Sequence, residues 1–179
     1  MHRRALFLDR DGVINVDHGY VWTPERTDFI DGIFEVIRDA RARDYLVIVV
    51  TNQAGIARGY YTEAQFKTYM AWVEREMEAR GAALDAVYYC PHHPTAGTGA
   101  YRRICECRKP APGMLLRAQR EHGLDLPASI LIGDKVSDIE AASSAGVGVP
   151  LLLGPQQTNS NLQTAFITDV REARNYILQ

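Results

Sequence analysis

Two aspartates two residues apart, Asp9 and Asp11, directly follow a short apolar run near the start of the chain. A carboxylate can attack phosphorus and form an aspartyl phosphate. A second carboxyl group nearby can protonate the leaving oxygen and then take a proton from the attacking water. Gly12 follows the pair and allows the backbone to turn close to a bound phosphate. This short segment therefore predicts phosphoryl transfer, with Asp9 and Asp11 sharing the two tasks.

Two carboxylates facing an anionic phosphate repel it, so this chemistry requires a hard cation. Mg²⁺ suits oxygen ligands and usually retains some of its waters. Asp134 is a natural additional ligand, with Asp138 one helical turn further along the chain. Thr51 can hold phosphate oxygens through its hydroxyl and backbone N–H, and Arg108 and Lys109 supply positive charge. These residue types predict a magnesium-dependent site for phosphate.

A second group of metal-binding residue types lies within one short window: Cys90, His92, His93, Cys105 and Cys107. Three cysteines and one histidine are a ligand set of structural zinc, which is tetrahedral and closed. Either histidine could complete the set, and the two close pairs are spaced more tightly than usual. The competing interpretation is three reduced cysteines, some of them buried as small apolar residues. Because a closed site leaves no position for substrate, we expect zinc to hold this loop rather than to catalyse.

An alternation of apolar runs and helical patterns predicts the scaffold that must position these residues. The predicted strands are 4–8, 46–50, 84–89, 129–132 and 147–153. Alternating strands and helices form parallel sheets with right-handed crossovers, and ligands bind beyond the carboxyl ends of the strands. The predicted fold class is α/β, a single Rossmann-like parallel sheet flanked by helices. Asp9, Thr51 and Asp134 each follow a predicted strand, so we expect them to meet at one edge.

Capping residues predict where several helices begin. Thr62 and Gln65 form a capping box before an apolar stripe, and Asp31 and Ser137 are predicted to cap two further helices. The polar residues 156–164 predict a loop, followed by a short helix. Between the first two predicted strands there is room only for a loop and one helix, so we expect no cap domain.

Composition excludes several classes of protein. The 179 residues suit a single domain, 1–179, and 46% apolar with 23% charged residues excludes a disordered chain. The net charge of -2 argues against a nucleic-acid-binding role. No apolar run can span a membrane, and the run after Arg3-Arg4 ends at Asp9, too early for a signal peptide. We therefore expect a cytoplasmic protein that binds neither nucleic acid nor membrane. We also expect a monomer that acts on a small molecule, although neither expectation follows from composition.

Four motifs, in this order, resemble those of the haloacid dehalogenase superfamily of phosphatases: Asp9-x-Asp11-Gly-Val, Thr51-Asn, Lys109-Pro and Gly133-Asp134-x-x-x-Asp138. The resemblance covers most of the chain. It implies Asp9 as the nucleophile and Asp11 as the acid and base. It also implies that Thr51 and Lys109 hold the phosphoryl group. Mg²⁺ would be bound by Asp9, the backbone carbonyl of Asp11 and Asp134.

A narrower set of motifs resembles the D-glycero-D-manno-heptose 1,7-bisphosphate 7-phosphatase family: Asp17-His-Gly-Tyr20-Val, Thr51-Asn-Gln53, Cys90-Pro-His92 and Cys105-x-Cys107-Arg-Lys-Pro110. The resemblance implies release of the sugar 7-phosphate in ADP- or GDP-heptose (lipopolysaccharide core) biosynthesis. It implies the zinc ligands Cys90, His92, Cys105 and Cys107, in a zinc loop of residues 90–108. It implies the substrate contacts Asp17, His18, Gly19, Tyr20, Asn52, Gln53, Arg108 and Lys135. Ala54 departs from the family, because a polar residue is common at that position.

Other functions fit parts of the pattern. Histidinol-phosphate phosphatases share the zinc-loop pattern, and a nucleic-acid end phosphatase could use an uncapped site. A receiver-type signalling domain also accepts a phosphoryl group on an aspartate, but Asp11 would shorten the lifetime of its acyl phosphate. A zinc-only interaction module would have no need of Asp9, Lys109 and Asp134. One assay with Mg²⁺ separates the three classes. An enzyme releases phosphate steadily, a signalling domain is only labelled stoichiometrically, and an interaction module does neither.

Overall fold

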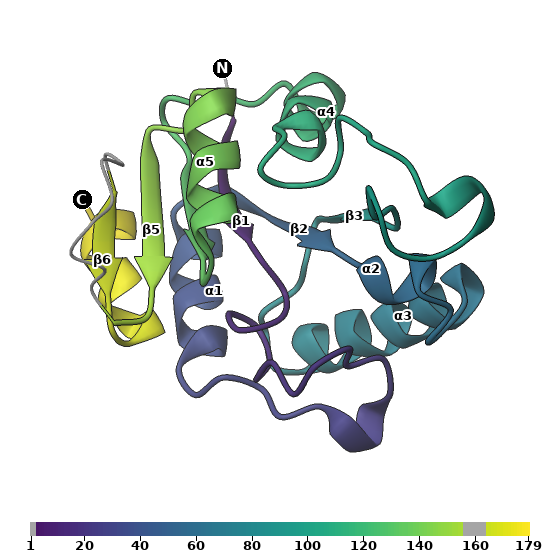
Figure 1. The fold of residues 1–179 in the computed structure, drawn as a ribbon. Helices are drawn as coiled ribbons and strands as arrows, with labels where there is room; N and C mark the ends of the chain where they lie inside the picture. Colours follow the sequence, from purple (N-terminus) through teal and green to yellow (C-terminus); the bar gives the residue numbers. More distant parts are fainter. Residues whose placement is uncertain (1–2, 156–163) are drawn as a thin grey trace.

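The computed structural model describes residues 3–155 and 164–179, and within them six parallel strands form one sheet in the order β3-β2-β1-β4-β5-β6 (Figure 1). The strands are β1 (Arg4–Leu8), β2 (Tyr45–Asn52), β3 (Ala86–Cys90), β4 (Ile130–Gly133), β5 (Val149–Leu153) and β6 (Ala165–Ile167). The predicted α/β fold is confirmed. The short β6 was not predicted, because three apolar residues carry no periodicity of their own. The predicted loop 156–164 lies outside the described residues, apart from its last residue.

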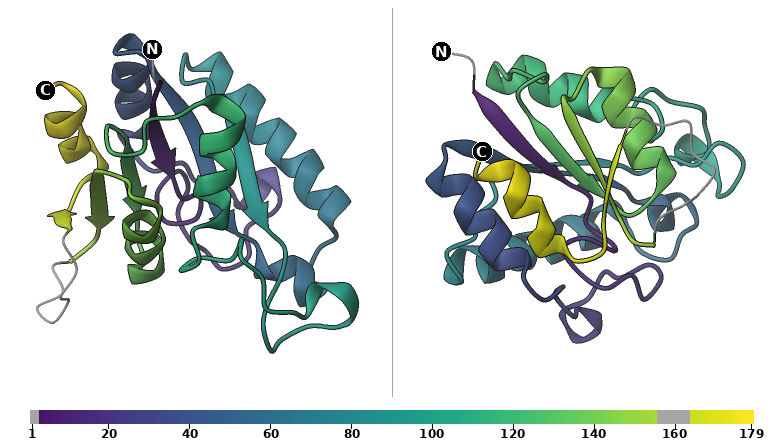
Figure 2. Two further views of the ribbon diagram at one scale, coloured as in Figure 1. Left: turned by 90° about the horizontal axis from the view of Figure 1, so that it is seen from above. Right: turned by 90° about the vertical axis from the view of Figure 1, so that its left-hand side faces the viewer.

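Helices cover both faces of the sheet (Figure 2). They are α1 (Ile33–Ala42), α2 (Ala54–Ala57), α3 (Glu63–Ala79), α4 (Gly113–His122), α5 (Val136–Ala145) and α6 (Arg174–Ile177), with the 3-10 helices η1 (Pro24–Arg26), η2 (Gly99–Tyr101) and η3 (Val170–Ala173). One core packs α1, α3 and α6 against the sheet, and a second core packs α4 and α5 against the opposite face. The sheet is therefore the middle of three layers.

The central strands are buried on both faces, which explains why they are unbroken apolar runs in the sequence. Alternate residues of a strand point to opposite faces. Leu6 and Leu8 of β1 belong to the core beneath α1 and α3, whereas Ala5 and Phe7 belong to the core beneath α4 and α5. This double burial fixes the end of β1, and the residues that follow it, relative to both layers of helices.

The beginnings of two helices test the predicted caps. The capping box is confirmed: the Thr62 hydroxyl accepts a hydrogen bond from the N–H of Gln65 (3.1 Å), and the Gln65 side chain accepts one from the N–H of Thr62 (2.8 Å). The prediction that Asp31 caps α1 is wrong. Gly32 occupies that position with a φ of +87°, and the Asp31 carboxylate forms an ion pair with Arg171 (2.6 Å).

Loops follow the carboxyl ends of the strands and line that edge of the sheet. As expected, the fully described segment between β1 and β2 contains only loops, η1 and α1. The segment between β3 and α4 contains η2 and carries Cys105 and Cys107, while Cys90 is the last residue of β3. In the described part of the chain, no helix combines the length and apolar character needed to cross a membrane.

Candidate active site

Three carboxylates gather at the carboxyl edge of the sheet. Asp9 follows β1, Asp134 follows β4, and Asp138 lies in the first turn of α5. One oxygen atom from each lies within 4.8 Å of the other two. Thr51 is buried near the end of β2, the strand next to β1. The structure thus places Asp9, Thr51 and Asp134 at the edge where the sequence predicts them.

Two glycines allow the carboxylates to approach the backbone. A Cβ atom on Gly12 would lie 2.2 Å from Oδ2 of Asp134, and the φ of Gly12 is +88°. A Cβ atom on Gly133 would lie 2.2 Å from Cβ of Asp138. Both distances are far shorter than any real contact, so a side chain at either position would displace an acidic residue. At Gly12 the positive φ adds a second reason for glycine.

The start of α5 differs from the prediction. The helix begins at Val136, so the prediction that Ser137 caps it is wrong. Oδ2 of Asp138 instead accepts a hydrogen bond from the N–H of Lys135 (3.0 Å). This contact anchors the Asp138 carboxylate, whose other oxygen, Oδ1, faces Lys109.

Lys109 is buried between two of the carboxylates, with 4% of its surface exposed. Its Nζ lies 3.1 Å from Oδ1 of Asp9 and 2.5 Å from Oδ1 of Asp138, and it donates to the backbone carbonyl of Val50 (2.7 Å). The side-chain amide of Asn52 accepts from the N–H of Lys109 (3.1 Å) and donates to its carbonyl (3.0 Å). The backbone and the ammonium group of Lys109 are therefore both held in place.

Burial and charge oppose each other in this cluster. Burial raises the pKa of Asp9, while the charge of Lys109 acts in the opposite direction. Burial alone would lower the pKa of Lys109, but the carboxylates of Asp9 and Asp138 outweigh it and raise that pKa. Lys109 is therefore a permanent cation beside Asp9. Such a cation can stabilise negative charge that develops on a transferring group.

Asp134 has a buried oxygen whose bonding capacity is unused. In the described part of the chain, its Oδ1 has no hydrogen-bond partner. Burial, and then the nearby charge of Asp9, raise the pKa of Asp134 to about 7. An unpaired buried carboxylate oxygen is costly unless it is protonated or bound to a cation. Asp9 and Asp134 therefore fit a hard divalent cation with oxygen ligands.

The carboxyl group of Asp11 belongs to a separate network. Nη2 of Arg10 lies 2.7 and 2.8 Å from its two oxygens and also donates to the carbonyl of Val21 (2.6 Å). The side-chain amides of Asn15 (3.1 Å) and Gln53 (3.2 Å) donate to the same carboxyl group. These contacts hold the Asp11 carboxyl group in one position at the edge of the sheet.

A cavity of about 570 Å³ opens beside Asp11 and Lys109. Its walls include seven of the eight predicted substrate contacts: Asp17, Gly19, Tyr20, Asn52, Gln53, Arg108 and Lys135. The eighth, His18, does not line this cavity, and its ring instead contacts the exposed Asp28 (2.7 Å). The loop after β1 and the loop before α4 thus face each other across the cavity.

Charged contacts hold the walls of the cavity. Asp17 and Lys135 form an ion pair (3.2 Å) between the loop after β1 and the start of α5. Burial would raise the pKa of Asp17, but the N–H of Gly19 and the charge of Lys135 together lower it. Nη1 of Arg108 donates to the carbonyl of His92 (3.2 Å). Arg108 is therefore tied to the cysteine-containing loop.

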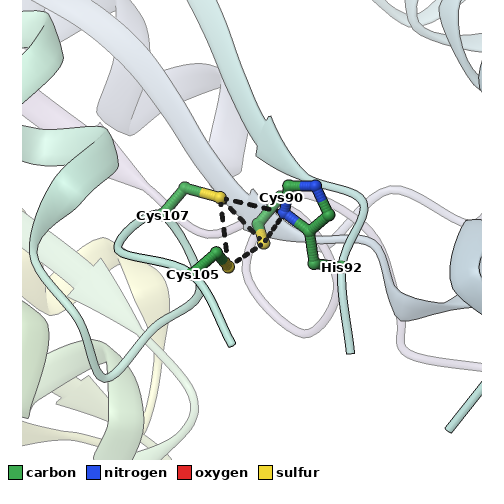
Figure 3. A group of neighbouring side chains, drawn as sticks. All are labelled: Cys90, His92, Cys105 and Cys107. Atoms are coloured by element: carbon green, nitrogen blue, oxygen red, sulfur yellow. Dashed lines mark hydrogen bonds between the residues drawn. The ribbon is translucent and has the colours of Figure 1, made fainter. Parts of the chain in front are cut away.

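Three thiols and one imidazole converge on this loop (Figure 3). Sγ of Cys90 lies 3.5 Å from that of Cys105 and 3.1 Å from that of Cys107. Nδ1 of His92 lies 3.4 Å from Sγ of Cys107 and 3.7 Å from that of Cys90. Ligand atoms around a tetrahedral zinc ion are roughly 3.5–3.8 Å apart, given bonds of about 2.0–2.3 Å. The donor set and its spacing therefore fit zinc.

The neighbouring histidine is engaged elsewhere. Nδ1 of His93 accepts hydrogen bonds from the N–H groups of Thr95 (3.2 Å) and Ala96 (2.8 Å). The structure thus brings His92, and not His93, to the thiols. His92 is also the histidine that the family resemblance implies.

Comparisons with known proteins agree with this geometry. Residues 106–174 match the HAD-hydrolase-like family. The chain is 52% identical over 177 residues to the D-glycero-alpha-D-manno-heptose-1,7-bisphosphate 7-phosphatase of Burkholderia mallei, covering 99% of this chain and 93% of that protein. It is 48% identical over 149 residues to the D-glycero-beta-D-manno-heptose-1,7-bisphosphate 7-phosphatase of Escherichia coli (strain K12), covering 83% and 78%. The chain belongs to the heptose 1,7-bisphosphate 7-phosphatase family.

A solved structure supports the same assignment. The D,D-heptose 1,7-bisphosphate phosphatase from B. bronchiseptica, crystallised with magnesium and phosphate, superposes with a TM-score of 0.83 at 31% identity and covers 98% of each chain. The resemblance predicted from the motifs is confirmed, and the chain is a phosphatase. Its membership of an enzyme family decides against the receiver-type domain and the zinc-only module.

Several contacts of this phosphatase could not be found from its sequence. Arg10 is fully buried, with its guanidinium 5.7 Å from the ring centre of Phe66 and 5.1 Å from that of Tyr69. Its place between two aspartates is the one signal that marked it. Nothing in the sequence marked Asn15, which contacts Asp11, or Tyr61, which contacts Gln53.

Proposed function

We propose that this phosphatase removes the 7-phosphate from D-glycero-D-manno-heptose 1,7-bisphosphate through an aspartyl phosphate on Asp9. The observation that carries the proposal is the buried ammonium of Lys109, held between Asp9 and Asp138 where the cavity opens. The names of the relatives supply the substrate. In this proposal residues 1–179 form one phosphatase domain, and the loop of residues 90–108 is held by zinc.

The chain's own residues divide the reaction into two halves. A carboxylate oxygen of Asp9 attacks phosphorus, and the bond between phosphorus and the sugar oxygen breaks as Asp11 protonates that oxygen. Water then attacks the phosphorus of the aspartyl phosphate while Asp11 takes its proton, and phosphate leaves. Lys109 and the hydroxyl of Thr51 stabilise charge on the equatorial oxygens throughout.

The carboxylates of Asp9 and Asp134 and the backbone carbonyl of Asp11 are the groups we propose for Mg²⁺. The unpartnered Oδ1 of Asp134 supports this proposal. When bound, Mg²⁺ neutralises the phosphate charge and stabilises the transition state. Asp138 stays with Lys109 in this arrangement and fixes its ammonium group.

Protons should compete with Mg²⁺ at Asp134. Because burial and Asp9 raise the pKa of Asp134 to about 7, this carboxyl group binds a proton as the pH falls below 7 in the metal-free protein. The dissociation constant of Mg²⁺ is expected to increase by up to about tenfold for each pH unit below 7, and to level off above pH 8. Mg²⁺ titrations of activity at several pH values, each at saturating substrate, measure this dependence. A constant affinity between pH 5.5 and 8 would contradict the expected competition.

Arg108 is the residue that we propose for the second phosphate. It lines the cavity next to Lys109, and its link to the His92 carbonyl directs its guanidinium. A guanidinium can bind a phosphate with two hydrogen bonds. Histidinol phosphate carries a cationic amine instead, which Arg108 would repel. Arg108 therefore favours the bisphosphate over the monophosphate of the alternative function.

Arg108→Ala is expected to weaken the preference for the bisphosphate by about 1.5–3 kcal/mol, or roughly 10- to 150-fold in kcat/KM, mainly through KM. Lys109→Ala should instead lower kcat for every phosphomonoester, because Lys109 contacts the transferring group. The matched control is Arg103→Ala, an exposed arginine of the same loop outside the cavity. Equal loss of activity on all substrates in Arg108→Ala would contradict this assignment.

Phosphate release from a panel of substrates with Mg²⁺ tests the proposed function. The panel contains both anomers of heptose 1,7-bisphosphate, histidinol phosphate, p-nitrophenyl phosphate and a 5′-phosphorylated oligonucleotide. We expect the highest kcat/KM for a heptose bisphosphate, with phosphorus NMR showing loss of the 7-phosphate. A preference for histidinol phosphate would overturn the substrate but keep the reaction class.

We further propose that the protein is a cytoplasmic monomer that binds neither nucleic acid nor membrane. Light scattering tests the oligomeric state, and cell fractionation tests the location.

A further inference from the structure

Gln53 connects three side chains at the active-site edge. It lies between β2 and α2 and is 2% exposed. Its Nε2 lies 2.8 Å from Oγ1 of Thr51 and 3.2 Å from Oδ2 of Asp11. Its Oε1 lies 2.6 Å from the hydroxyl oxygen of Tyr61. All of the polar atoms of this side chain are therefore in contact with protein groups.

The hydrogen bonds of Gln53 define which way its amide points. Its Nε2 donates to Oδ2 of Asp11, and an amide nitrogen can only donate hydrogen bonds. The same nitrogen faces Thr51, which means that the Thr51 oxygen accepts a hydrogen bond from Gln53. The hydrogen of the Thr51 hydroxyl is therefore left free to point elsewhere.

Tyr61 closes the network at its other end. The Gln53 oxygen that it contacts is an acceptor, so the Tyr61 hydroxyl must donate. Burial raises the pKa of Tyr61, which keeps that hydroxyl protonated. The aromatic ring of Tyr61 packs against Trp22 and Phe66, which holds the hydroxyl in place. The hydrogen bonds from Tyr61 to Gln53 and from Gln53 to Thr51 thus all run in the same direction.

We propose that Gln53 is a positioning residue, which accepts from Tyr61 and donates to Thr51 so that the Thr51 hydroxyl hydrogen points at the transferring phosphoryl group. This inference rests on the proposed function, because it assigns Thr51 to that group. It differs from the family resemblance, which implies that Gln53 contacts the substrate. Without Gln53, the Thr51 hydroxyl rotates freely and spends part of its time with its hydrogen in unproductive directions.

A double-mutant cycle separates this role from a substrate contact. The variants are Gln53→Leu, Thr51→Val and their combination, assayed with p-nitrophenyl phosphate and Mg²⁺. If Gln53 acts through Thr51, we expect each single variant to lower kcat about tenfold or more with little change in KM. The combined variant should be little worse than Thr51→Val alone, because the residue that Gln53 orients is already missing.

Tyr61→Phe is a second way to disturb the amide that retains the aromatic ring. It should lower kcat less than Gln53→Leu does, and it should have no further effect in the Thr51→Val background. Its matched control is Tyr60→Phe, which removes the hydroxyl of the exposed neighbouring tyrosine and should leave kcat unchanged. This second cycle carries the test even where Gln53→Leu fails to fold.

Two results would overturn the inference while the proposed function stands. In the first, the fold-decrease in kcat of a combined variant equals the product of the decreases in its two single variants, which would make Gln53 independent of Thr51. The other is a rise in KM at constant kcat in Gln53→Leu, which would make Gln53 a substrate contact. Wild-type protein that hydrolyses no phosphomonoester would instead overturn the proposed function, and this inference with it.

Discussion

Asp9→Asn protein is expected to release no phosphate in the steady state, with kcat/KM lower by about 10⁴-fold or more. An asparagine amide cannot form the acyl phosphate, and the variant also lacks one of the charged oxygen ligands that we propose for Mg²⁺. Phosphate release from heptose bisphosphate and p-nitrophenyl phosphate at saturating Mg²⁺ measures the loss. Acid quenching should trap an aspartyl phosphate in the wild type and none in the variant.

The same variant is expected to fold at least as well as the wild type. Asp9, Asp134 and Asp138 lie close together, and two of these three carboxylates, Asp9 and Asp138, share the buried ammonium of Lys109. Burial raises the pKa of Asp9, which means that its charged form is costly in the folded protein. Removing this charge relieves repulsion, and Lys109 keeps its contact with Asp138. The melting temperature without metal should therefore stay constant or rise.

A matched control separates the chemistry of Asp9 from the general effect of the substitution. Asp31→Asn makes the same change at an exposed aspartate that pairs with Arg171, outside the acidic cluster. It should leave both turnover and melting near the wild-type values. Turnover above about one per cent in Asp9→Asn would assign the nucleophile to another residue.

The edge that gathers the acidic residues could be predicted because simple rules determine it. Asp9 and Asp134 each follow an apolar run of strand length, and parallel strands end at the same edge of a sheet. Thr51 obeys the same rule at the end of β2. The cysteine cluster was predictable from residue type, because every thiol of the chain lies in one short window.

Contacts between distant side chains could not be predicted in this way. Arg10 stands in a row of charged residues, and its burial depends on the Val21 carbonyl and on aromatic rings of α3. The expected cap Asp31 is drawn to Arg171, which is far along the chain, while Gly32 takes its position. Such outcomes depend on tertiary packing, which overrides local capping preferences.

Cys105→Ala protein is expected to lose its zinc and to melt at a lower temperature. The three remaining donors cannot complete a tetrahedral site, and metal binding is coupled to folding. The sheet has cores of its own, so we expect a loss of about 3 kcal/mol rather than the ~10–16 kcal/mol of zinc-finger peptides. This loss corresponds to a fall of roughly 6–12 °C. Elemental analysis and calorimetry measure the two effects.

The kinetic consequence of zinc loss should be uneven. Arg108 is tied to the cluster through the carbonyl of His92, whereas Lys109 is held by Asn52 and by its buried carboxylate partners. The preference for the bisphosphate should therefore weaken before turnover of p-nitrophenyl phosphate falls. Brief treatment with EDTA should instead stop turnover of both substrates by removing Mg²⁺, and added Mg²⁺ should restore it.

The two adjacent histidines provide a matched control for the role of the metal. His92 has its Nδ1 among the thiols, whereas the ring of His93 accepts two backbone N–H groups outside the cluster. His92→Ala should reproduce the zinc loss of Cys105→Ala, and His93→Ala should retain the metal. Because both changes remove an imidazole from the same loop, a difference between them reports metal binding rather than lost packing. Equal zinc content in all three variants, or none in the wild type, would mean that protein contacts alone direct Arg108 into the cavity.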